Sequence, residues 1–341
     1  MALKRLVFSL LAAALAGALG GQGAWAASVH PRVHAHVHAR SAEAMGAACD
    51  EPCLKGFAFD YMTALAAHDP TGLKLAADVR FTENTRPLKL GDGLWGTITA
   101  LGAYRHYLAD PATGEVALFS AVEEQGVPAL FLLRLRIQDF KISEAETIVV
   151  RKQDVPALFN PLRTLQPLWE EVAPLEERIG RDALVKVADS YFDALVQGSA
   201  ALAPFDEDCM RFENGVQTVN NPASRPAPGA RNGFNPGAMG CWEQIDNQVF
   251  AYISRIEPRR FVVVDESHQA VLALAMFHHN GRTTTVETPN NGTYRLPAAV
   301  QRPFDEVVGE AFRIKDGKIR EIEALTTSLP YGSDDGWEAR R

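Results

Sequence analysis

The sequence predicts an α+β protein that contains two diverged copies of one domain. A short motif carries the repeat, because Arg80-Phe-Thr-Glu-Asn84 returns as Arg211-Phe-Glu-Asn214. A second echo follows each motif, where Trp95-Gly-Thr-Ile98 corresponds to Trp242-Glu-Gln-Ile245. In each copy a helical pattern comes first and strand patterns follow, which is typical of α+β folds rather than of βαβ units. Because the echoes keep their order, we infer a duplication.

Length and charge limit the class of protein. The chain has 341 residues, of which 47% are hydrophobic, enough for two domains with cores of their own. Its formal net charge is −8, and removal of Lys4 and Arg5 with the leader leaves 32 basic against 42 acidic residues, a charge of −10. Nucleic acid is therefore not expected as a partner, because neutralising phosphates needs a basic face.

Residues 1–26 have the three parts of a secretory signal. A basic pair comes first, an apolar run spans 6–19, and Ala24-Trp-Ala26 forms the cleavage site. The run is too short to span a bilayer comfortably, so we expect cleavage after Ala26 rather than an uncleaved anchor. The mature protein is predicted to be periplasmic or secreted, with no further contact with a membrane.

Residues 27–48 are predicted to be a flexible linker. They contain His30, His34, His36 and His38, whose imidazoles could bind a transition metal. A disordered segment beside the new N-terminus is the favoured interpretation. We therefore assign no metal and expect no cofactor.

The four cysteines are predicted to form two disulfides. Export favours disulfides, because they persist in oxidising compartments. Cys49 lies close to Cys53, and Cys209 and Cys241 both fall in the second copy, so we predict these two pairs. A Cys-x-x-Cys redox site or a zinc site is disfavoured by the spacing and by the lack of a second close pair.

Residues 49–152 are predicted to form the first domain. It begins with an amphipathic helix over 54–67, in which apolar residues recur every four positions. A short strand is expected at 79–82, and residues 97–107 are predicted as a second helical piece with Tyr104 on its apolar side. The strands that complete the domain are rich in Val, Leu, Ile and Phe and span 115–124, 128–138 and 142–151.

The second copy repeats this plan. A proline-containing linker over 153–180 leads to the second domain, 181–330, and residues 331–341 are a C-terminal tail. A helix is predicted at 182–197, a strand at 209–212, and a long loop at 214–240, a length typical of lids or binding loops. The remaining strands are expected at 260–265, 270–279, 307–314 and 319–327, with a polar insertion at 280–302.

The order of these elements resembles a known superfamily. Each copy ends in a turn and strand, Asp139 to Glu146 and Asp316-Gly-Lys-Ile-Arg-Glu-Ile-Glu323, like the cone-shaped nuclear transport factor 2-like (SnoaL-like) fold. Arg80 to Asn84, Leu90-Gly-Asp-Gly-Leu-Trp95 and Cys49 to Leu54 look more specifically like an uncharacterised family of exported fungal and bacterial proteins, DUF8021. The resemblance covers roughly residues 49 to 330. It implies two tandem cone-shaped domains, each with helices packed on a curved antiparallel sheet.

The superfamily has many functions. It contains ketosteroid isomerase, scytalone dehydratase, limonene-epoxide hydrolase and polyketide cyclases, as well as binding proteins, so the fold does not decide the function. In the enzymes, an apolar cone raises the pKa of a buried carboxyl group toward neutrality for proton transfer. The sequence matches no subfamily's catalytic set, and none is transferred.

In the first domain the candidate residues lie in the repeated motif. Glu83 would act as the general acid or base, Asn84 would orient the substrate, and Arg80 would anchor an oxygen atom. The alternative is structural, with Arg80 and Glu83 paired and Asn84 capping the turn. Because the motif recurs in the second copy, a shared structural role is at least as well supported.

In the second domain the candidate acid and base are Glu213 and His278. An inward-facing histidine near Asp246 or Glu213 would form an acid/base pair, although a histidine at the rim with both nitrogens satisfied is the more common case. The predicted substrate-binding residues are Trp95, Tyr104, Trp242 and Asp246. Both acidic pairs of the terminal strands, Glu144 with Glu146 and Glu321 with Glu323, are predicted to lie on solvated faces and are left out of the site.

These features favour an exported, cofactor-independent enzyme that uses acid/base chemistry on a small cyclic or aromatic molecule. Isomerase, dehydratase or other lyase, and hydrolase chemistry remain open. The alternative is a non-catalytic periplasmic protein that binds a small molecule or acts as a scaffold. In either case the two copies could pair internally through their sheets, or the chain could form a homo-oligomer.

Overall fold

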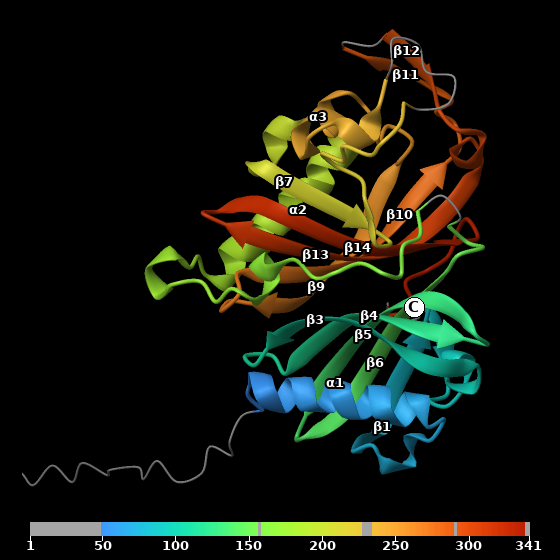
Figure 1. Ribbon diagram of the computed structural model, residues 1–341, viewed down its shortest axis with the longest axis vertical. Coiled ribbons are helices and arrows are strands. Elements are labelled where there is room, and N and C mark those ends of the chain that lie inside the picture. Colours follow the sequence, from blue (N-terminus) through green and yellow to red (C-terminus); the bar gives the residue numbers. More distant parts are fainter. Residues whose placement is uncertain (1–48, 156–157, 227–233, 290–291, 338–341) are drawn as a thin grey trace, which may run out of the picture. The chain divides into compact units, whose positions relative to one another are not determined.

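The computed structural model describes residues 49–155, 158–226, 234–289 and 292–337. These residues form two similar domains, each with a long helix and a six-stranded sheet, so the predicted α+β class is confirmed (Figure 1). The predicted signal peptide, residues 1–26, and the histidine-containing linker, residues 27–48, lie outside the described residues. None of the described helices has the length and hydrophobicity needed to cross a bilayer.

The first domain contains one mixed sheet. Its order is β2-β1-β6-β5-β4-β3. The pairing of β1 with β6 is parallel and the other pairings are antiparallel. The sheet is therefore mixed, whereas a wholly antiparallel sheet was expected. The elements are α1 (Glu51–Ala66), η1 (Pro70–Gly72), β1 (Leu75–Glu83), β2 (Arg86–Leu88), η2 (Gly93–Gly96), β3 (Ile98–Asp110), β4 (Glu115–Glu124), β5 (Val127–Gln138) and β6 (Lys141–Arg151).

The second domain has the same order, β8-β7-β14-β13-β10-β9, with β7 parallel to β14. Its elements are α2 (Arg181–Gln197), η5 (Ala200–Leu202), β7 (Phe205–Glu213), β8 (Val216–Gln217), η7 (Pro236–Ala238), α3 (Cys241–Asp246), β9 (Arg255–Asp265), β10 (Ala270–Asn280), β13 (Pro303–Lys315) and β14 (Lys318–Leu329). The polar insertion contains the hairpin of β11 (Thr285–Thr288) and β12 (Gly292–Arg295), followed by η8 (Ala298–Val300). Before α2, the linker contains η3 (Pro167–Glu170) and η4 (Leu175–Glu177).

The prediction of a second helical piece at 97–107 was wrong, because this segment belongs to β3. Its register against β4 shifts twice, between Ile98 and Ala100 and again between Leu101 and Arg105. A β-bulge adds a residue to one strand and breaks the alternation of faces. The apolar residues are therefore spaced like those of a helix although the backbone is extended.

Each long helix covers one face of its own sheet. In the first domain Leu54, Tyr61 and Leu65 of α1 pack with apolar residues of the sheet, and in the second domain Tyr191 and Phe192 of α2 do the same. We call the space between helix and sheet the first cone and the second cone. Both predicted disulfides, Cys49–Cys53 and Cys209–Cys241, are present.

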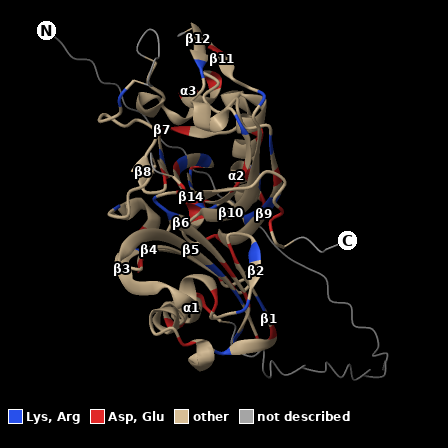
Figure 2. Cartoon of the chain, turned by 90° about the vertical axis from the view of Figure 1, so that its right-hand side faces the viewer, with Lys and Arg blue, Asp and Glu red and all other residues tan. Residues whose placement is uncertain are grey.

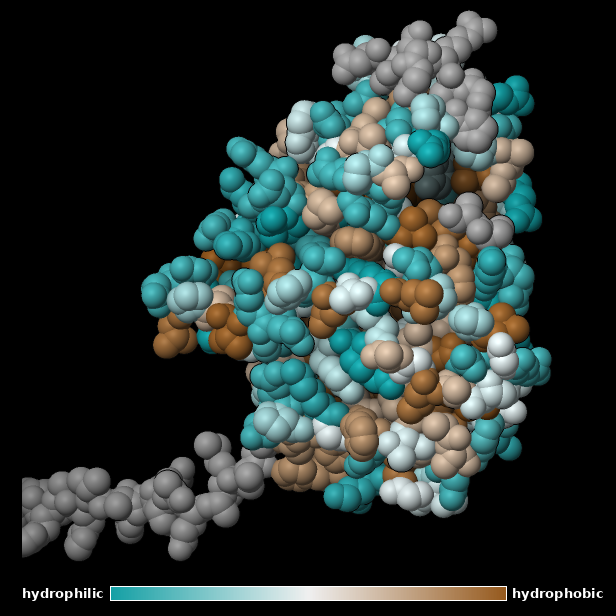
Figure 3. Space-filling view, in the orientation of Figure 1, coloured by the Kyte–Doolittle hydropathy of each residue, from teal (hydrophilic) through white to brown (hydrophobic). Residues whose placement is uncertain are grey.

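The other faces of the two sheets pack against each other. One buried cluster combines Phe119 and Leu132 of the first sheet with Leu272 and Leu274 of the second. A side chain at Gly309 would not fit there, because a Cβ atom would lie 2.1 Å from the Leu132 side chain. The strands of both sheets therefore lie between α1 and α2 (Figure 1). Exposed apolar side chains are scattered among polar ones on the face seen in Figure 3.

The prediction that the acidic pairs lie on solvated faces was wrong for Glu146, Glu321 and Glu323. Their exposed fractions are only 4%, 4% and 3%. Period two did place each pair on one face, but that face is covered by the other domain. Figure 2 shows basic and acidic segments close together around β14 and β6.

Glu323 is the centre of this polar interface. Its carboxylate accepts hydrogen bonds from the Tyr104 hydroxyl at 2.8 Å and from His106 Nδ1 at 2.6 Å. Arg163 of the linker forms ion pairs with both Glu323, at 3.3 Å, and Glu321, at 2.7 Å. Burial alone would raise the pKa of Glu323, but Arg163 and His106 hold it below its usual value.

Candidate functional site

The first cone is filled by its own side chains. Trp95, one of the predicted substrate-binding residues, is only 1% exposed and donates a hydrogen bond from Nε1 to the Tyr61 hydroxyl at 3.0 Å. The two rings meet edge to face with centroids 5.1 Å apart. Leu94 and Phe131 complete the same buried cluster. Trp95 therefore acts as a core residue.

Glu83 supports the turn that carries Trp95. One carboxylate oxygen accepts the Leu94 N–H at 2.8 Å, and Arg151 lies 3.7 Å from the other. Burial raises the pKa of Glu83 although the Leu94 N–H and Arg151 oppose the shift. Gly93 has a φ of +69°, and a Cβ atom there would come within 2.6 Å of the carboxylate. Glu83 is therefore enclosed between the strand and the turn.

Arg80 forms its contacts with the C-terminal segment rather than an ion pair with Glu83. It is exposed and lies over the ring of Trp337, with the guanidinium carbon 4.2 Å from the ring centroid. It also donates hydrogen bonds to the backbone of Gly336 and Trp337. Residues 331–337, predicted as a tail, thus reach back to the first domain, where Trp337 Nε1 donates to the Thr82 hydroxyl at 3.1 Å.

Asn84 and its counterpart Asn214 have the same structural role. Both adopt a φ of 47°. Asn84 bonds the backbone of Val149 through both ends of its amide, at 2.8 and 3.0 Å, and Asn214 does the same with Thr326, at 2.9 and 3.1 Å. The repeated asparagine therefore connects the end of one strand to its parallel neighbour in each domain.

The shared asparagine also reveals a shift in the repeat. Counted back from Asn84 and Asn214, Arg211 corresponds to Phe81 and not to Arg80, because the second motif is one residue shorter. The sheet registers agree, since Glu83 pairs with Thr147 and Glu213 with Ala324. A shift of one residue moves a side chain to the other face of a strand. Arg211 therefore points into the second cone, where the first cone has a phenylalanine.

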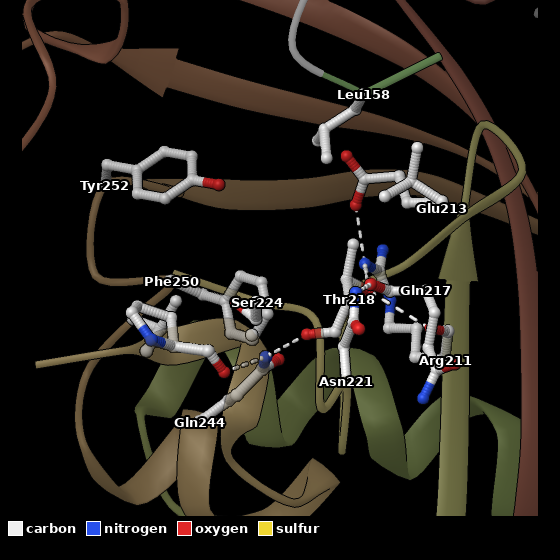
Figure 4. A pocket seen from close by; sticks show the side chains of 14 residues that line it. Leu158, Arg211, Glu213, Gln217, Thr218, Asn221, Ser224, Gln244, Phe250 and Tyr252 are labelled. Atoms are coloured by element: carbon white, nitrogen blue, oxygen red, sulfur yellow. Dashed lines mark hydrogen bonds and ion pairs between the residues drawn. The ribbon is translucent and has the colours of Figure 1, made fainter. Parts of the chain in front are cut away.

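The second cone contains a cavity with two adjoining chambers. The outer chamber has a volume of about 410 Å³ and the inner one of about 170 Å³. Both are lined by Leu158, Arg211, Glu213, Phe250 and Tyr252, and Figure 4 shows these side chains around a common space. The inner chamber is otherwise lined by Leu195, Ile253, Phe277, Val300, Phe304, Glu306, Val308 and Thr326.

Three carboxylates and one guanidinium meet in this cone. Arg211 is 2.5 Å from Glu213 and 3.2 Å from Glu310. Glu306 lies four residues before Glu310 on the same face of β13. Its nearest basic group is His279, at 3.7 Å. Among the described residues, no lysine or arginine lies within ion-pair distance of Glu306. No three His, Cys, Asp or Glu side chains in the same ranges are arranged as metal ligands.

Burial changes the charge state of these groups. Burial, and next the charge of Glu213, raise the pKa of Glu306 from 4.5 to about 8. Burial raises the pKa of Glu310 to about 7, although Arg211 opposes the shift. Burial lowers the pKa of His279 to about 4, so its ring is neutral at pH 7. At neutral pH Glu306 therefore retains its proton.

We expect Glu306→Gln to stabilise the protein at high pH. A carboxyl group with a raised pKa in the folded state favours folding fully below its unfolded pKa of 4.5, and this contribution is lost as the pH rises to about 8. Glutamine has no proton to lose. The variant should match the wild type at pH 5 and exceed its free energy of unfolding at pH 9 by on the order of 2 kcal/mol. Urea unfolding of both proteins at both pH values measures this. A difference in free energy of unfolding between variant and wild type that is the same at pH 5 and pH 9 would contradict the prediction.

The other predicted second-domain residues lie outside the cavity. His278 Nδ1 bonds Asp305 at 2.7 Å and Nε2 is 2.8 Å from the Glu257 carbonyl oxygen, so both nitrogens are satisfied. Trp242 on α3 is 48% exposed. Asp246 accepts the Ala200 N–H at 2.9 Å and caps a short helix. Tyr104 lies in the interface between the sheets, as described above, so Glu213 is the predicted residue that lines the cavity.

Sequence reasoning missed Arg211, Glu306 and Glu310. The signal for the carboxylates was present, because Glu306 and Glu310 interrupt an apolar strand at positions that share one face with Val308 and Phe312. A charged residue on the apolar face of a strand is an unusual feature. For Arg211 the signal was hidden by the one-residue shift of the motif.

The wall of the outer chamber comes from the long loop. Gln244 on α3 donates hydrogen bonds to the carbonyl oxygens of Thr218, at 2.6 Å, and Pro236, at 2.8 Å, and so joins two parts of the loop (Figure 4). The Cys209–Cys241 disulfide ties the start of the same helix to β7. The cavity wall is therefore fastened next to Arg211.

Residues 177–326 match the model of a domain of unknown function, DUF8021. The matched range covers nearly the whole second domain. It supplies every residue that lines the inner chamber except Leu158, which comes from the linker. The matched range begins just before α2 and ends at Thr326 of β14. It therefore contains β7 and β13, the two strands that carry the charged side chains of the cone. The residues Arg211, Glu213, Glu306 and Glu310 all lie within the matched range.

Solved structures resemble parts of the chain at low identity. A de novo designed protein with a curved β-sheet matches with a TM-score of 0.27 and 15% identity, over 31% of this chain and 92% of its own. A steroid delta-isomerase from Pseudomonas aeruginosa matches with a TM-score of 0.24 and 17% identity, over 29% of this chain and 81% of its own. A putative polyketide cyclase from Streptomyces antibioticus matches with a TM-score of 0.25 and 12% identity, over 42% of this chain and 91% of its own. No curated protein sequence matches the chain.

Proposed function

We propose that the second domain binds a small, largely apolar molecule in its cone and acts on it by acid/base chemistry. One observation carries this proposal: Glu306 lines an aromatic-walled chamber and has no arginine or lysine partner in the described ranges. Burial raises its pKa to about 8, which suits a group that gives and takes a proton near neutral pH. The chamber is of a size suited to a single cyclic or aromatic group.

The residues around Glu306 would have different roles. Arg211 fixes the position of Glu213 next to the reacting group, because the two side chains are in contact at 2.5 Å. Phe277 and Phe304 exclude water from the inner chamber. A proton would then move between Glu306 and the bound molecule, which is the step common to isomerisation, dehydration and many hydrolyses.

Export remains part of the proposal. Two disulfides are compatible with an oxidising compartment, and the net charge after leader removal would be negative. The second candidate function is binding without chemistry. It is favoured by the pairing of Arg211 with both Glu213 and Glu310, because this guanidinium is not free to polarise a substrate oxygen.

The test is mass spectrometry of a host-cell small-molecule extract after incubation with the mature protein. We expect a mass-shifted product with the wild type and a rate at least about 10²-fold lower with Glu306→Gln, as removal of a general acid or base predicts. Glu83→Gln, the matched change in the filled first cone, should leave the rate unchanged. A product that survives Glu306→Gln contradicts our assignment, and a molecule recovered unchanged from the protein supports the binding function.

A further inference from the structure

The second cone contains more acidic than basic groups. Within the described ranges, Glu213 and Glu310 share the guanidinium of Arg211, and the basic group near Glu306 is the neutral His279 ring at 3.7 Å. We infer that the molecule bound in this cone carries a basic nitrogen, with its ammonium group beside Glu306 and its apolar part among the aromatic rings of the inner chamber. This inference rests on the proposed function, because it names the ligand class of the same cavity.

Sheet register places the aromatic rings around Glu306. Phe277 pairs with Glu306 across β10 and β13, so the two side chains lie next to each other on the cone face. Phe304 lies two residues before Glu306 on the same face and stacks on His279 with centroids 4.0 Å apart. The Tyr252 ring also stacks on His279, with centroids 5.3 Å apart. A carboxylate bordered by aromatic rings is the chemistry that recognises an organic cation.

A second polar group faces the same chamber without a partner. The Thr326 side chain is 5% exposed, lines the inner chamber, and its hydroxyl oxygen has no hydrogen-bond partner among the described residues. Unsatisfied buried polar groups are rare and need an explanation. An ammonium group has several N–H donors, so one could bond Glu306 and another the Thr326 hydroxyl. A bound amine would thus satisfy both side chains.

An anionic ligand fits this cone less well. Arg211 is already engaged by Glu213 and Glu310, so a ligand carboxylate that pairs with it would have to displace one of them. A neutral ligand displaces neither carboxylate, but it forms no ion pair with Glu306. The expected order of affinity is therefore amine, neutral molecule, then acid.

Binding of an amine should also release a proton. The ammonium charge favours the ionised form of Glu306, whose pKa is otherwise raised to about 8 by burial. The charged and titratable groups that face Glu306 are Arg211 and Glu213 on β7, Tyr252, His279 on β10 and Glu310 on β13. Glu306 has a higher pKa than Glu310 and supplies the proton.

The probes are benzylamine, benzyl alcohol and benzoate, which have the same ring and differ in charge. Isothermal titration calorimetry at pH 7 should give at least about tenfold tighter binding of benzylamine than of benzyl alcohol, with benzoate weakest. Glu306→Gln should remove this preference and keep the affinity for benzyl alcohol within about twofold. Glu287→Gln, an exposed change on β11, should leave all three affinities unchanged.

The wild type alone provides a second readout that does not depend on a variant. The heat of benzylamine binding should differ between Tris and phosphate buffers, because a released proton is taken up by the buffer, whereas the heat for benzyl alcohol should not. Equal affinities for the amine and the alcohol, or tightest binding of benzoate, overturn the inferred ligand class while the cone still binds small molecules. If none of the three probes binds the wild type, the proposed function fails as well.

Discussion

Replacement of Arg211 by leucine should lower the free energy of unfolding by about 3–5 kcal/mol at pH 8. The change leaves Glu213 and Glu310 in a buried cone without their cation. The loss should be smaller at pH 5, because Glu310, whose pKa burial raises to about 7, is then protonated and avoids the buried charge. Urea unfolding followed by tryptophan fluorescence at both pH values measures the effect.

Arg80→Leu is the matched control for this prediction. Each arginine is the first residue of its copy of the motif, but Arg80 is exposed and contacts the Trp337 ring and nearby backbone. Its loss should cost about 1 kcal/mol or less. Equal losses for the two variants would show that the motif, and not the face of the strand, determines the role of the arginine.

Glu323→Ala should destabilise the protein by a similar amount, about 3–5 kcal/mol. This carboxylate accepts hydrogen bonds from Tyr104 and His106 and pairs with Arg163, and the variant leaves all three buried without it. Arg163 keeps its ion pair with Glu321 at 2.7 Å, so most of the loss should come from the Tyr104 hydroxyl and the His106 ring, which lose a buried acceptor. Thermal and urea unfolding at pH 7 measure the loss.

An exposed glutamate provides the control for the interface. Glu123→Ala on β4 removes a carboxylate from solvent and should change stability by no more than about 0.5 kcal/mol. Glu323→Gln should lie between the two, because the amide keeps a hydrogen-bond acceptor but loses the charge. A stability loss for Glu323→Ala as small as that of Glu123→Ala would mean that water replaces the carboxylate in the interface.

Local patterns predicted most elements well. Helices α1 and α2 carry the apolar faces from which they were predicted, and they follow Asp50 and Gly180. Strands β4, β5 and β6 lie within a residue of their predicted bounds. The two disulfides also followed from cysteine spacing and compartment. The segment of β3 failed because two register shifts gave its apolar residues a helical spacing. A bulge depends on the neighbouring strand, which the segment itself does not specify.

The candidate site was harder to predict than the fold. The motif with Arg80, Glu83 and Asn84 drew attention to the first domain, where the cone is filled by Trp95 and Tyr61. The second copy lacks one residue before its asparagine, and this deletion turns Arg211 into the cone. In the second cone a charged side chain replaces an apolar one, and one of its carboxylate partners, Glu310, comes from the distant strand β13.

By itself, the sequence determined the order of the two copies, the cysteine pairs and which residues share a strand face. Period two placed Glu321 with Glu323, and it also places Glu306 with Glu310, whatever surrounds them. Only the tertiary structure decided what covers each face. One face of β14 meets the other domain and forms the buried network of Glu323, whereas β13 turns Glu306 toward a cavity. Burial depends on the packing of segments distant in sequence, and a strand's own residues do not encode it.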